Sequence, residues 1–225
     1  MTRLPIDADY ERPIHARYLD PVELVWLAAC ERLGITLRRD PSIFSRTDGS
    51  GMLWLGPRSD LDPDDSLCQM LLHELCHWVT NGVDTFHERD WGCPLDDLHD
   101  LRELSCLRVQ AWLADQHGLR AMLGPTGLYR QYFDRIPADA LEPLDDSELE
   151  ADVAALAREA VARTRQPPFH PHLHDALAAT AKMAQIVAPF LNSYATEVEG
   201  DTLPSLWDLT RRSPEPQILP GDERT

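Results

Sequence analysis

The sequence predicts an α+β fold, a compact domain that is mostly helical with a small sheet ahead of one central helix. Apolar residues recur at helical spacing in several stretches that begin at capping residues or end at glycine. Between residues 35 and 55, short apolar pieces alternate instead with Asp, Pro and Gly, which is typical of strands and turns. Residues 1–199 are expected to form a single domain, and residues 200–225 a proline-rich, acidic and mostly disordered tail.

The first half of the chain contains two predicted helices separated by the strand-like pieces. The first helix starts after Asp20, with Pro21 at its first position and Gly34 at its end. The second covers about 66–81, carries a long apolar run and stops at Gly82. The three strand-like pieces between them are residues 35–39, 43–45 and 52–55.

Three more helices are predicted in the second half of the chain. The helix at about 96–117 has leucines along its core side and Gly118 as its stop. The next, 147–163, has an acidic first turn, which suits the positive end of the helix dipole. The last runs from about 171 to 190. A sheet followed by several helices favours the α+β class.

Composition excludes two classes of partner. The net charge of −17 argues against nucleic acid and against an anionic membrane surface, because both bind basic patches. No run of 18 apolar residues is present, so no membrane span is expected, and residues 1–20 lack the apolar core of a signal peptide. The five cysteines are an odd number without a regular spacing, so we expect reduced thiols in a cytoplasmic protein.

The most informative motif lies in the second predicted helix, where residues 73–77 read HELCH and match HExxH. Residues four apart share one face of a helix, so His73 and His77 can bind one metal ion together. Glu74 is placed to polarise a metal-bound water or to make an outer contact. The alternative is that both histidines are ordinary core residues. The surrounding helix signals favour the metal site.

Two histidines need a third ligand from elsewhere in the chain. Glu103 on the next predicted helix is the best candidate, because its neighbours place it on an inward-looking face where an unpaired carboxylate is costly. A metal ion would supply its partner, and so would a nearby arginine or exposure to solvent. The residues held in reserve as ligands are His87, Asp90 and His99.

The residues after the motif exclude one class of metalloprotease. A metzincin has Gly and His three and six residues after the second histidine, and Thr80 and Val83 stand there instead. The order of helix, small sheet, HExxH helix and ligand helix is that of a compact zincin-like domain. In such folds the strand before the metal helix often flanks the cleft, so residues 52–55 either line the cleft or form an ordinary buried strand.

Other potential ligands have simpler interpretations. His170, His172 and His174 form a second histidine cluster. His170 and His174 are four apart and could form a second metal clip, but an exposed helix start with Pro171 at its first position is the preferred interpretation. The cysteines near the motif are either soft ligands, a redox pair or small buried apolar residues, of which the last is the most common. These cysteines are Cys76, Cys93 and Cys106.

A wider pattern extends beyond the motif. Its members are His73-Glu74, His77-Trp78, Gly82, Asp90-Trp91-Gly92, Glu103 and Gln110-Ala111. In these residues the segment 73–111 resembles the elongation factor P hydroxylase family of bacteria, which modifies a lysine-derived side chain of that translation factor. The resemblance implies that His73, His77 and Glu103 hold the metal and that Asp90 and Gln110 shape the pocket. Cys93-Pro94 stand where the family has aromatic residues.

Two histidines and one carboxylate serve two chemistries. With Fe(II) the set suits hydroxylation, and hydroxylase-like side-chain modification is the favoured function. With Zn(II) it suits a metallopeptidase or other hydrolase in which Glu74 is the general base. A degenerate metal fold acting as an interaction module is the least favoured. We therefore expect a metalloenzyme with one divalent ion, Zn or Fe(II), and a protein or peptide substrate, a translation factor being one candidate.

Overall fold

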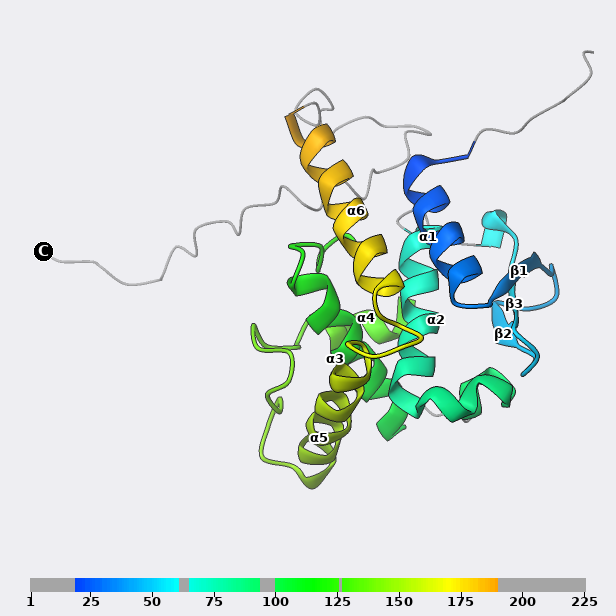
Figure 1. The fold of residues 1–225 in the computed structure, drawn as a ribbon. Coiled ribbons are helices and arrows are strands. Elements are labelled where there is room, and N and C mark those ends of the chain that lie inside the picture. The colour runs from blue at the N-terminus through cyan, green and yellow to red at the C-terminus, as the bar shows by residue number, and fades with distance from the viewer. Residues whose placement is uncertain (1–18, 61–64, 94–99, 126, 190–225) are drawn as a thin grey trace, which may run out of the picture.

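The structure is a computed structural model that describes residues 19–60, 65–93, 100–125 and 127–189. The α+β class is confirmed, since helices pack around one another with a small three-stranded sheet at one side (Figure 1). The α-helices in these ranges are α1 (Pro21–Arg32), α2 (Leu67–Asn81), α3 (Leu101–Asp115), α4 (Arg130–Phe133), α5 (Glu148–Arg163) and α6 (His172–Val187). Single turns of 3-10 helix are η1 (Arg58–Asp60), η2 (Val83–His87), η3 (Asp90–Gly92) and η4 (Gly127–Tyr129).

The sheet contains β1 (Thr36–Arg39), β2 (Ser45–Thr47) and β3 (Met52–Leu55), in the order β1-β3-β2. β3 is therefore the central strand, parallel to β1 and antiparallel to β2. Leu53 and Leu55 of β3 are buried in the core beside α1 and α2. β2 begins two residues later than the predicted piece 43–45. Beside it, the N–H of Gly56 donates a 2.8 Å hydrogen bond to the carbonyl oxygen of Phe44, which ends the pairing with β3 before Ile43.

Capping residues set where the helices begin. Ser66 caps α2 and forms a capping box with Gln69, which confirms the predicted helix at 66–81. The helix predicted at 96–117 begins later, at Leu101, because the side chain of Asp100 accepts the first free N–H groups and its backbone is extended. The predicted helix at 147–163 is confirmed as α5, capped by Ser147.

α2 lies at the centre of the molecule, in contact with α1, α3 and α5 (Figure 1). Apolar residues surround it on almost every side, which is the pattern of a core helix. Within α2 only His73, Glu74 and Asn81 are not fully buried. Apart from Asn81 at its end, α2 is thus incompletely buried only at the first two residues of the HExxH motif.

The remaining helices pack in pairs around α2. α3 lies against α5, and α1 lies against α6, where Trp26 Nε1 donates a 3.0 Å hydrogen bond to Thr180 Oγ1 in the buried interface. Among the described residues, no helix has both the length and the apolar character needed to cross a bilayer. The predictions made for residues 1–18 and for the tail 200–225 fall outside the described residues.

Candidate metal centre

His73 and His77 project from the same face of α2, one turn apart. Their Nε2 atoms lie 3.1 Å from each other, and the rings meet edge to face with centroids 4.6 Å apart. The side chains are 19% and 11% exposed. Helical spacing therefore brings two imidazole nitrogens to one point at the edge of the core, as the motif predicts.

Glu103 reaches this point from the first turn of α3. Its Oε1 lies 3.5 Å from Nε2 of His73, and its Oε2 lies 3.4 Å from Nε2 of His77. The capping carboxylate of Asp100 fixes the start of α3 and thereby the position of Glu103 along the helix. The structure thus brings together the three ligands predicted from sequence.

Gln110, two turns further along α3, orients His73. Its Nε2 donates a 2.7 Å hydrogen bond to the carbonyl oxygen of Leu123, so its Oε1 faces Nδ1 of His73 at 3.0 Å. An amide oxygen only accepts, so Nδ1 of His73 carries a proton, and in the neutral tautomer of the ring Nε2 carries the lone pair. Gln110 is fully buried and lies behind the ligand instead of lining the cavity.

His77 has a different partner on its outer side. Its Nδ1 lies 3.2 Å from Sγ of Cys93, and Nδ2 of Asn81 donates a 2.9 Å hydrogen bond to the same sulfur. Burial, and secondarily the neighbouring His73, hold the pKa of His77 well below its usual value of 6.5. His77 is therefore neutral at physiological pH.

The facing nitrogens of the two histidines restrict what can lie between them. In the tautomer of His73 with its lone pair on Nε2, His77 either donates its own Nε2–H to that lone pair or the lone pairs of both rings bind one cation. Oε1 of Glu103 is buried and has no hydrogen-bond partner among the described residues. Burial also raises the pKa of Glu103 above its usual value of 4.5. A cation between the three side chains would compensate this buried carboxylate, so the residues fit a metal ion.

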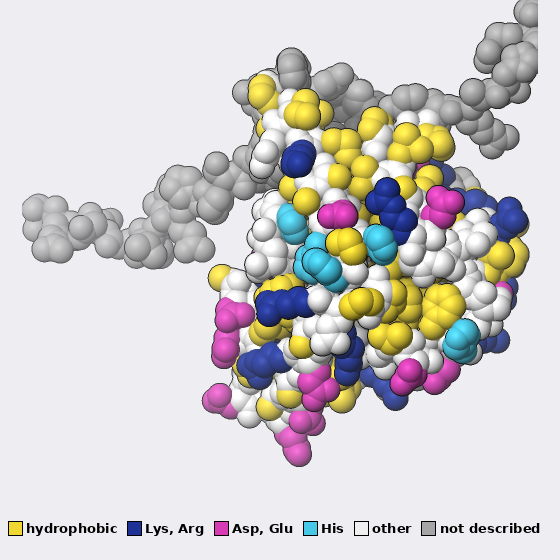
Figure 2. All heavy atoms as spheres, viewed as in Figure 1, with side chains coloured by type: hydrophobic (Ala, Val, Ile, Leu, Met, Phe, Trp, Pro, Cys, Tyr) yellow, Lys and Arg dark blue, Asp and Glu magenta, His cyan; other side chains and the backbone are white. Residues whose placement is uncertain are grey.

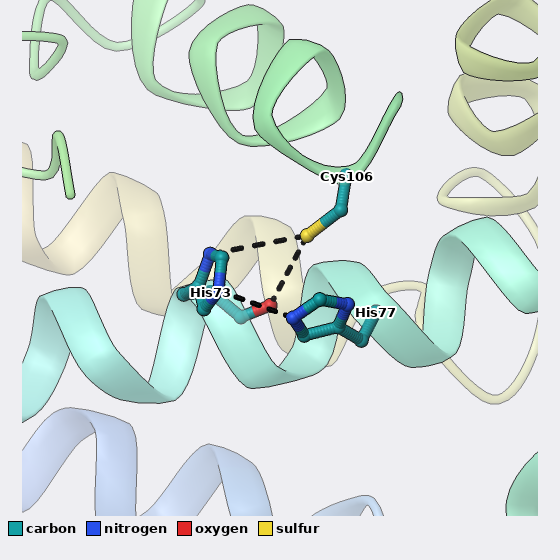
Figure 3. Close-up of side chains that lie close together, drawn as sticks. All are labelled: His73, His77 and Cys106. Atoms are coloured by element: carbon teal, nitrogen blue, oxygen red, sulfur yellow. Dashed lines mark hydrogen bonds between the residues drawn. The ribbon is translucent and has the colours of Figure 1, made fainter. Parts of the chain in front are cut away.

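Cys106 forms an alternative group with the two histidines. One ligand atom from each of His73, His77 and Cys106 lies within 4.8 Å of the others, which makes this buried group capable of binding a metal ion. Figure 3 shows the Cys106 sulfur pointing from α3 toward His73. Its Sγ lies 3.9 Å from Nδ1 and 3.6 Å from the backbone oxygen of His73. It thus approaches the side of His73 that Gln110 occupies, whereas Glu103 approaches Nε2 of both histidines.

A cavity of about 270 Å³ opens above the candidate centre. The polar residues at its floor are His73, Glu74, His77 and Glu103. The apolar and aromatic residues that line it are Phe44, Met70, Trp91, Pro125 and Tyr129. Ser45 and Arg46 of β2 also line it, whereas no residue of β3 does, so residues 52–55 form an ordinary buried strand at the centre of the sheet.

Glu74 lies in this cavity, one residue after the first histidine. Burial raises the pKa of its carboxyl above 4.5, while His73, Ser45 and Trp91 act in the opposite direction. Ser45 Oγ and Trp91 Nε1 are themselves buried without a hydrogen bond of ordinary geometry in the described part of the chain. The carboxyl of Glu74 thus lies close enough to these two donors for both to affect its pKa.

Asp90 lines the cavity and also fixes the strand beside it. Its Oδ1 accepts a 2.9 Å hydrogen bond from the backbone N–H of Thr47, and Arg89 contacts its Oδ2 at 3.2 Å. Asp90 and Trp91 both have positive φ, 51° and 54°, a conformation that costs energy for residues with a side chain. This turn places the Trp91 ring against Trp78, with centroids 5.4 Å apart and near-parallel planes.

The reserve ligands do not join the centre. Asp90 is engaged as above, His87 is exposed and outside the cavity, and His99 falls outside the described residues. His170 and His174 have ring centroids 6.0 Å apart. Figure 2 shows histidine side chains gathered on one face of the molecule. In the described ranges, however, no third His, Cys, Asp or Glu completes a metal group with them.

Sequence reasoning missed the outer partner of His77. Asn81 lies four residues after His77, so His73, His77 and Asn81 follow one face of α2, and this spacing is the only local signal. Cys93 comes into contact with His77 only because the chain turns back through η2 and η3.

Comparisons of the chain with protein-family models, with curated proteins and with solved structures give no match.

Replacing Gln110 with leucine is expected to weaken zinc binding roughly 10- to 100-fold, because losing an outer partner of a metal-binding histidine has effects of this size. Competition with a chromophoric chelator measures the affinity. Gln116→Leu, at an exposed position after the same helix, serves as the control and is expected to bind zinc like the wild type. Equal affinity of Gln110→Leu and wild type would contradict the role of Gln110.

Proposed function

We propose that this chain is a mononuclear metal-dependent enzyme that modifies a side chain of a protein or peptide, in a zincin-like arrangement. The proposed reaction is hydroxylase-like, as in the elongation factor P hydroxylase family that residues 73–111 resemble. The observation that carries the proposal is the carboxylate of Glu103, whose buried Oε1 has no hydrogen-bond partner among the described residues. Its two oxygens lie 3.5 Å from Nε2 of His73 and 3.4 Å from Nε2 of His77. A translation factor in the cytoplasm is one candidate substrate.

His73, His77 and Glu103 would hold one divalent ion, and two imidazoles with one carboxylate suit Fe(II) as well as Zn(II). With Fe(II) bound, the centre would supply oxygen activation for hydroxylation, which also consumes two electrons from a reductant. Gln110 and Cys93 hold the two rings in place through their Nδ1 atoms. The chain's own contribution is thus a fixed set of three ligands at the floor of a cavity.

The surroundings of β2 support a side chain, and not an extended backbone, as the group that enters. β2 is the edge strand beside the cavity, but its free edge is largely occupied. Asp48 forms an antiparallel bridge with Arg89, and the N–H of Thr47 donates to Asp90. An extended peptide therefore has little of the edge left to pair with. A side chain of the substrate fits the cavity of about 270 Å³ instead.

Part of the cavity lining is apolar and buried. Met70 and Trp91 contribute buried apolar surface to the cavity, and Tyr129 lies with its ring centroid 6.5 Å from that of His73. Buried apolar surface beside charged groups strengthens the electrostatic interactions between them. Glu74, with its raised pKa, can take up or release a proton next to the bound substrate.

The position of Glu74 favours a second candidate function, a zinc-dependent hydrolase. Its carboxyl lines the same cavity as both histidines, and burial raises its pKa toward neutrality, as a general base requires. In this reaction Glu74 would accept the proton of the attacking water and pass it to the leaving group. The two candidates share every ligand and differ in the metal.

Metal analysis of protein produced without added metals tests the proposal and separates the two reactions. We expect about one metal ion per chain, with iron and oxygen consumption upon addition of a protein substrate for the hydroxylase, and zinc for the hydrolase. Glu74→Gln is expected to retain the metal and, in the hydrolase, to lower the rate at least 100-fold. Wild-type protein without bound metal after reconstitution would contradict both candidates.

A further inference from the structure

The sulfur of Cys93 contacts both His77 and Asn81 at the edge of the cavity. It lies 3.2 Å from Nδ1 of His77 and accepts a 2.9 Å hydrogen bond from Nδ2 of Asn81. Its backbone is fixed as well, because the Cys93 N–H donates a 2.8 Å hydrogen bond to the carbonyl oxygen of Asp90. The thiol is thus held on two sides against the ring of one proposed ligand.

The chemistry of these three groups determines what the sulfur does. The Nδ2 of Asn81 only donates, so the sulfur accepts from it. Toward His77 a thiol can either donate or accept. A neutral imidazole that uses Nε2 as a metal ligand carries its proton on Nδ1, and toward that proton the sulfur is the acceptor. Cys93 can therefore support the form of His77 that leaves Nε2 free.

We propose that Cys93, held by Asn81, is the positioning residue for His77 and sets both the ring orientation and the tautomer that binds metal. The inference rests on the proposed metal site and extends it to this chain's own outer contacts. His73 is held by the amide of Gln110, whereas His77 is held by a thiol. The two ligands are therefore supported by different chemistry, and each support can be removed separately.

The test is zinc affinity of the full-length chain, measured by chelator competition. Cys93→Ala is expected to weaken binding roughly 10- to 100-fold, the range found when outer partners of ligand histidines are removed. Cys93→Ser is expected to recover much of the loss, because a hydroxyl also accepts from Nδ1–H. Cys68→Ala, at a buried cysteine outside the cavity, is the matched control and is expected to bind like the wild type.

Cobalt(II) gives a second readout that a merely structural role would not change. The visible absorption of the cobalt-loaded protein is expected to shift in Cys93→Ala and to return toward the wild-type spectrum in Cys93→Ser. Equal zinc affinity of Cys93→Ala and wild type would overturn the inference while leaving the metal site intact. A wild-type chain that binds no zinc would overturn the metal site itself, and the inference with it.

Asn81→Ala provides an independent variant in case Cys93→Ala fails to fold. It removes the donor that holds the sulfur but leaves the thiol in place. We expect it to weaken zinc binding in the same direction and by a smaller factor than Cys93→Ala. Wild-type affinity in Asn81→Ala, together with a folded protein by circular dichroism, would overturn the part of the inference that assigns a role to Asn81.

Discussion

Glu103→Ala is expected to abolish stoichiometric metal binding, whereas Cys106→Ala is expected to retain about one metal ion per chain. The carboxylate lies 3.4–3.5 Å from Nε2 of both histidines, while the sulfur of Cys106 approaches only the Nδ1 side and the backbone of His73. Loss of a ligand is expected to lower affinity at least about 100-fold, since even outer partners have effects of 10- to 100-fold. Metal content after gel filtration and zinc affinity by chelator competition measure the difference.

The pair of variants also separates loss of metal from loss of fold. Cys106 is fully buried, so its replacement by alanine leaves a small cavity and is expected to lower the free energy of unfolding by about 1 kcal/mol. The thermal midpoint of both metal-free variants therefore serves as a control. Retention of metal by Glu103→Ala combined with its loss in Cys106→Ala would show that the sulfur, and not the carboxylate, is the third ligand.

Arg108→Met is expected to lower the free energy of unfolding by about 3–5 kcal/mol, the cost of breaking a buried ion pair on one side. Arg108 is fully buried on α3 and pairs with Glu150 of α5, which is 5% exposed. It also donates to Tyr132 Oη at 2.9 Å and to the carbonyl oxygens of Ala140 and Glu142. Urea unfolding followed by circular dichroism measures the change in stability.

Two further variants sharpen this prediction. Arg130→Met removes a surface pair with Asp134, four residues away on the chain, and is expected to cost below about 0.5 kcal/mol. Adding Glu150→Gln to Arg108→Met is expected to recover part of the loss, because no buried carboxylate then remains without a counter-charge. A loss in Arg108→Met no larger than that in Arg130→Met would mean that the pair is not important for stability.

Arg108 also shows why the site depends on the packing of α3 and α5. The same helix carries Glu103 and Gln110, and its position beside α2 is fixed partly by the pair with Glu150. Sequence periodicity placed this helix but gave no sign that one of its arginines is buried. A buried arginine can be recognised only from its partners, which come from α4, α5 and the loop between them.

Local signals in the sequence were sufficient for several elements. Ser147 with the acidic turn after it marks a helix start that the structure confirms. The apolar run placed α2, whereas its capping box of Ser66 with Gln69 was not predicted. The predicted start at about residue 96 was wrong, because α3 begins at Leu101 after its cap Asp100. The spacing of apolar residues gives no information about that cap. α4 and the 3-10 turns were not predicted, since elements of three to five residues carry almost no periodicity.

The sequence by itself determined the α+β class, the central helix and the pairing of His73 with His77, because these depend on helical period and on caps within a few residues. The tertiary structure decided everything that depends on separate segments meeting. It brought Glu103 to the Nε2 atoms and Cys106 to the opposite side, and it made β2 instead of β3 the strand beside the cavity. It also placed Cys93 against His77. Such contacts follow from how the helices pack and how the chain turns back between them, and no local pattern of residues specifies that geometry.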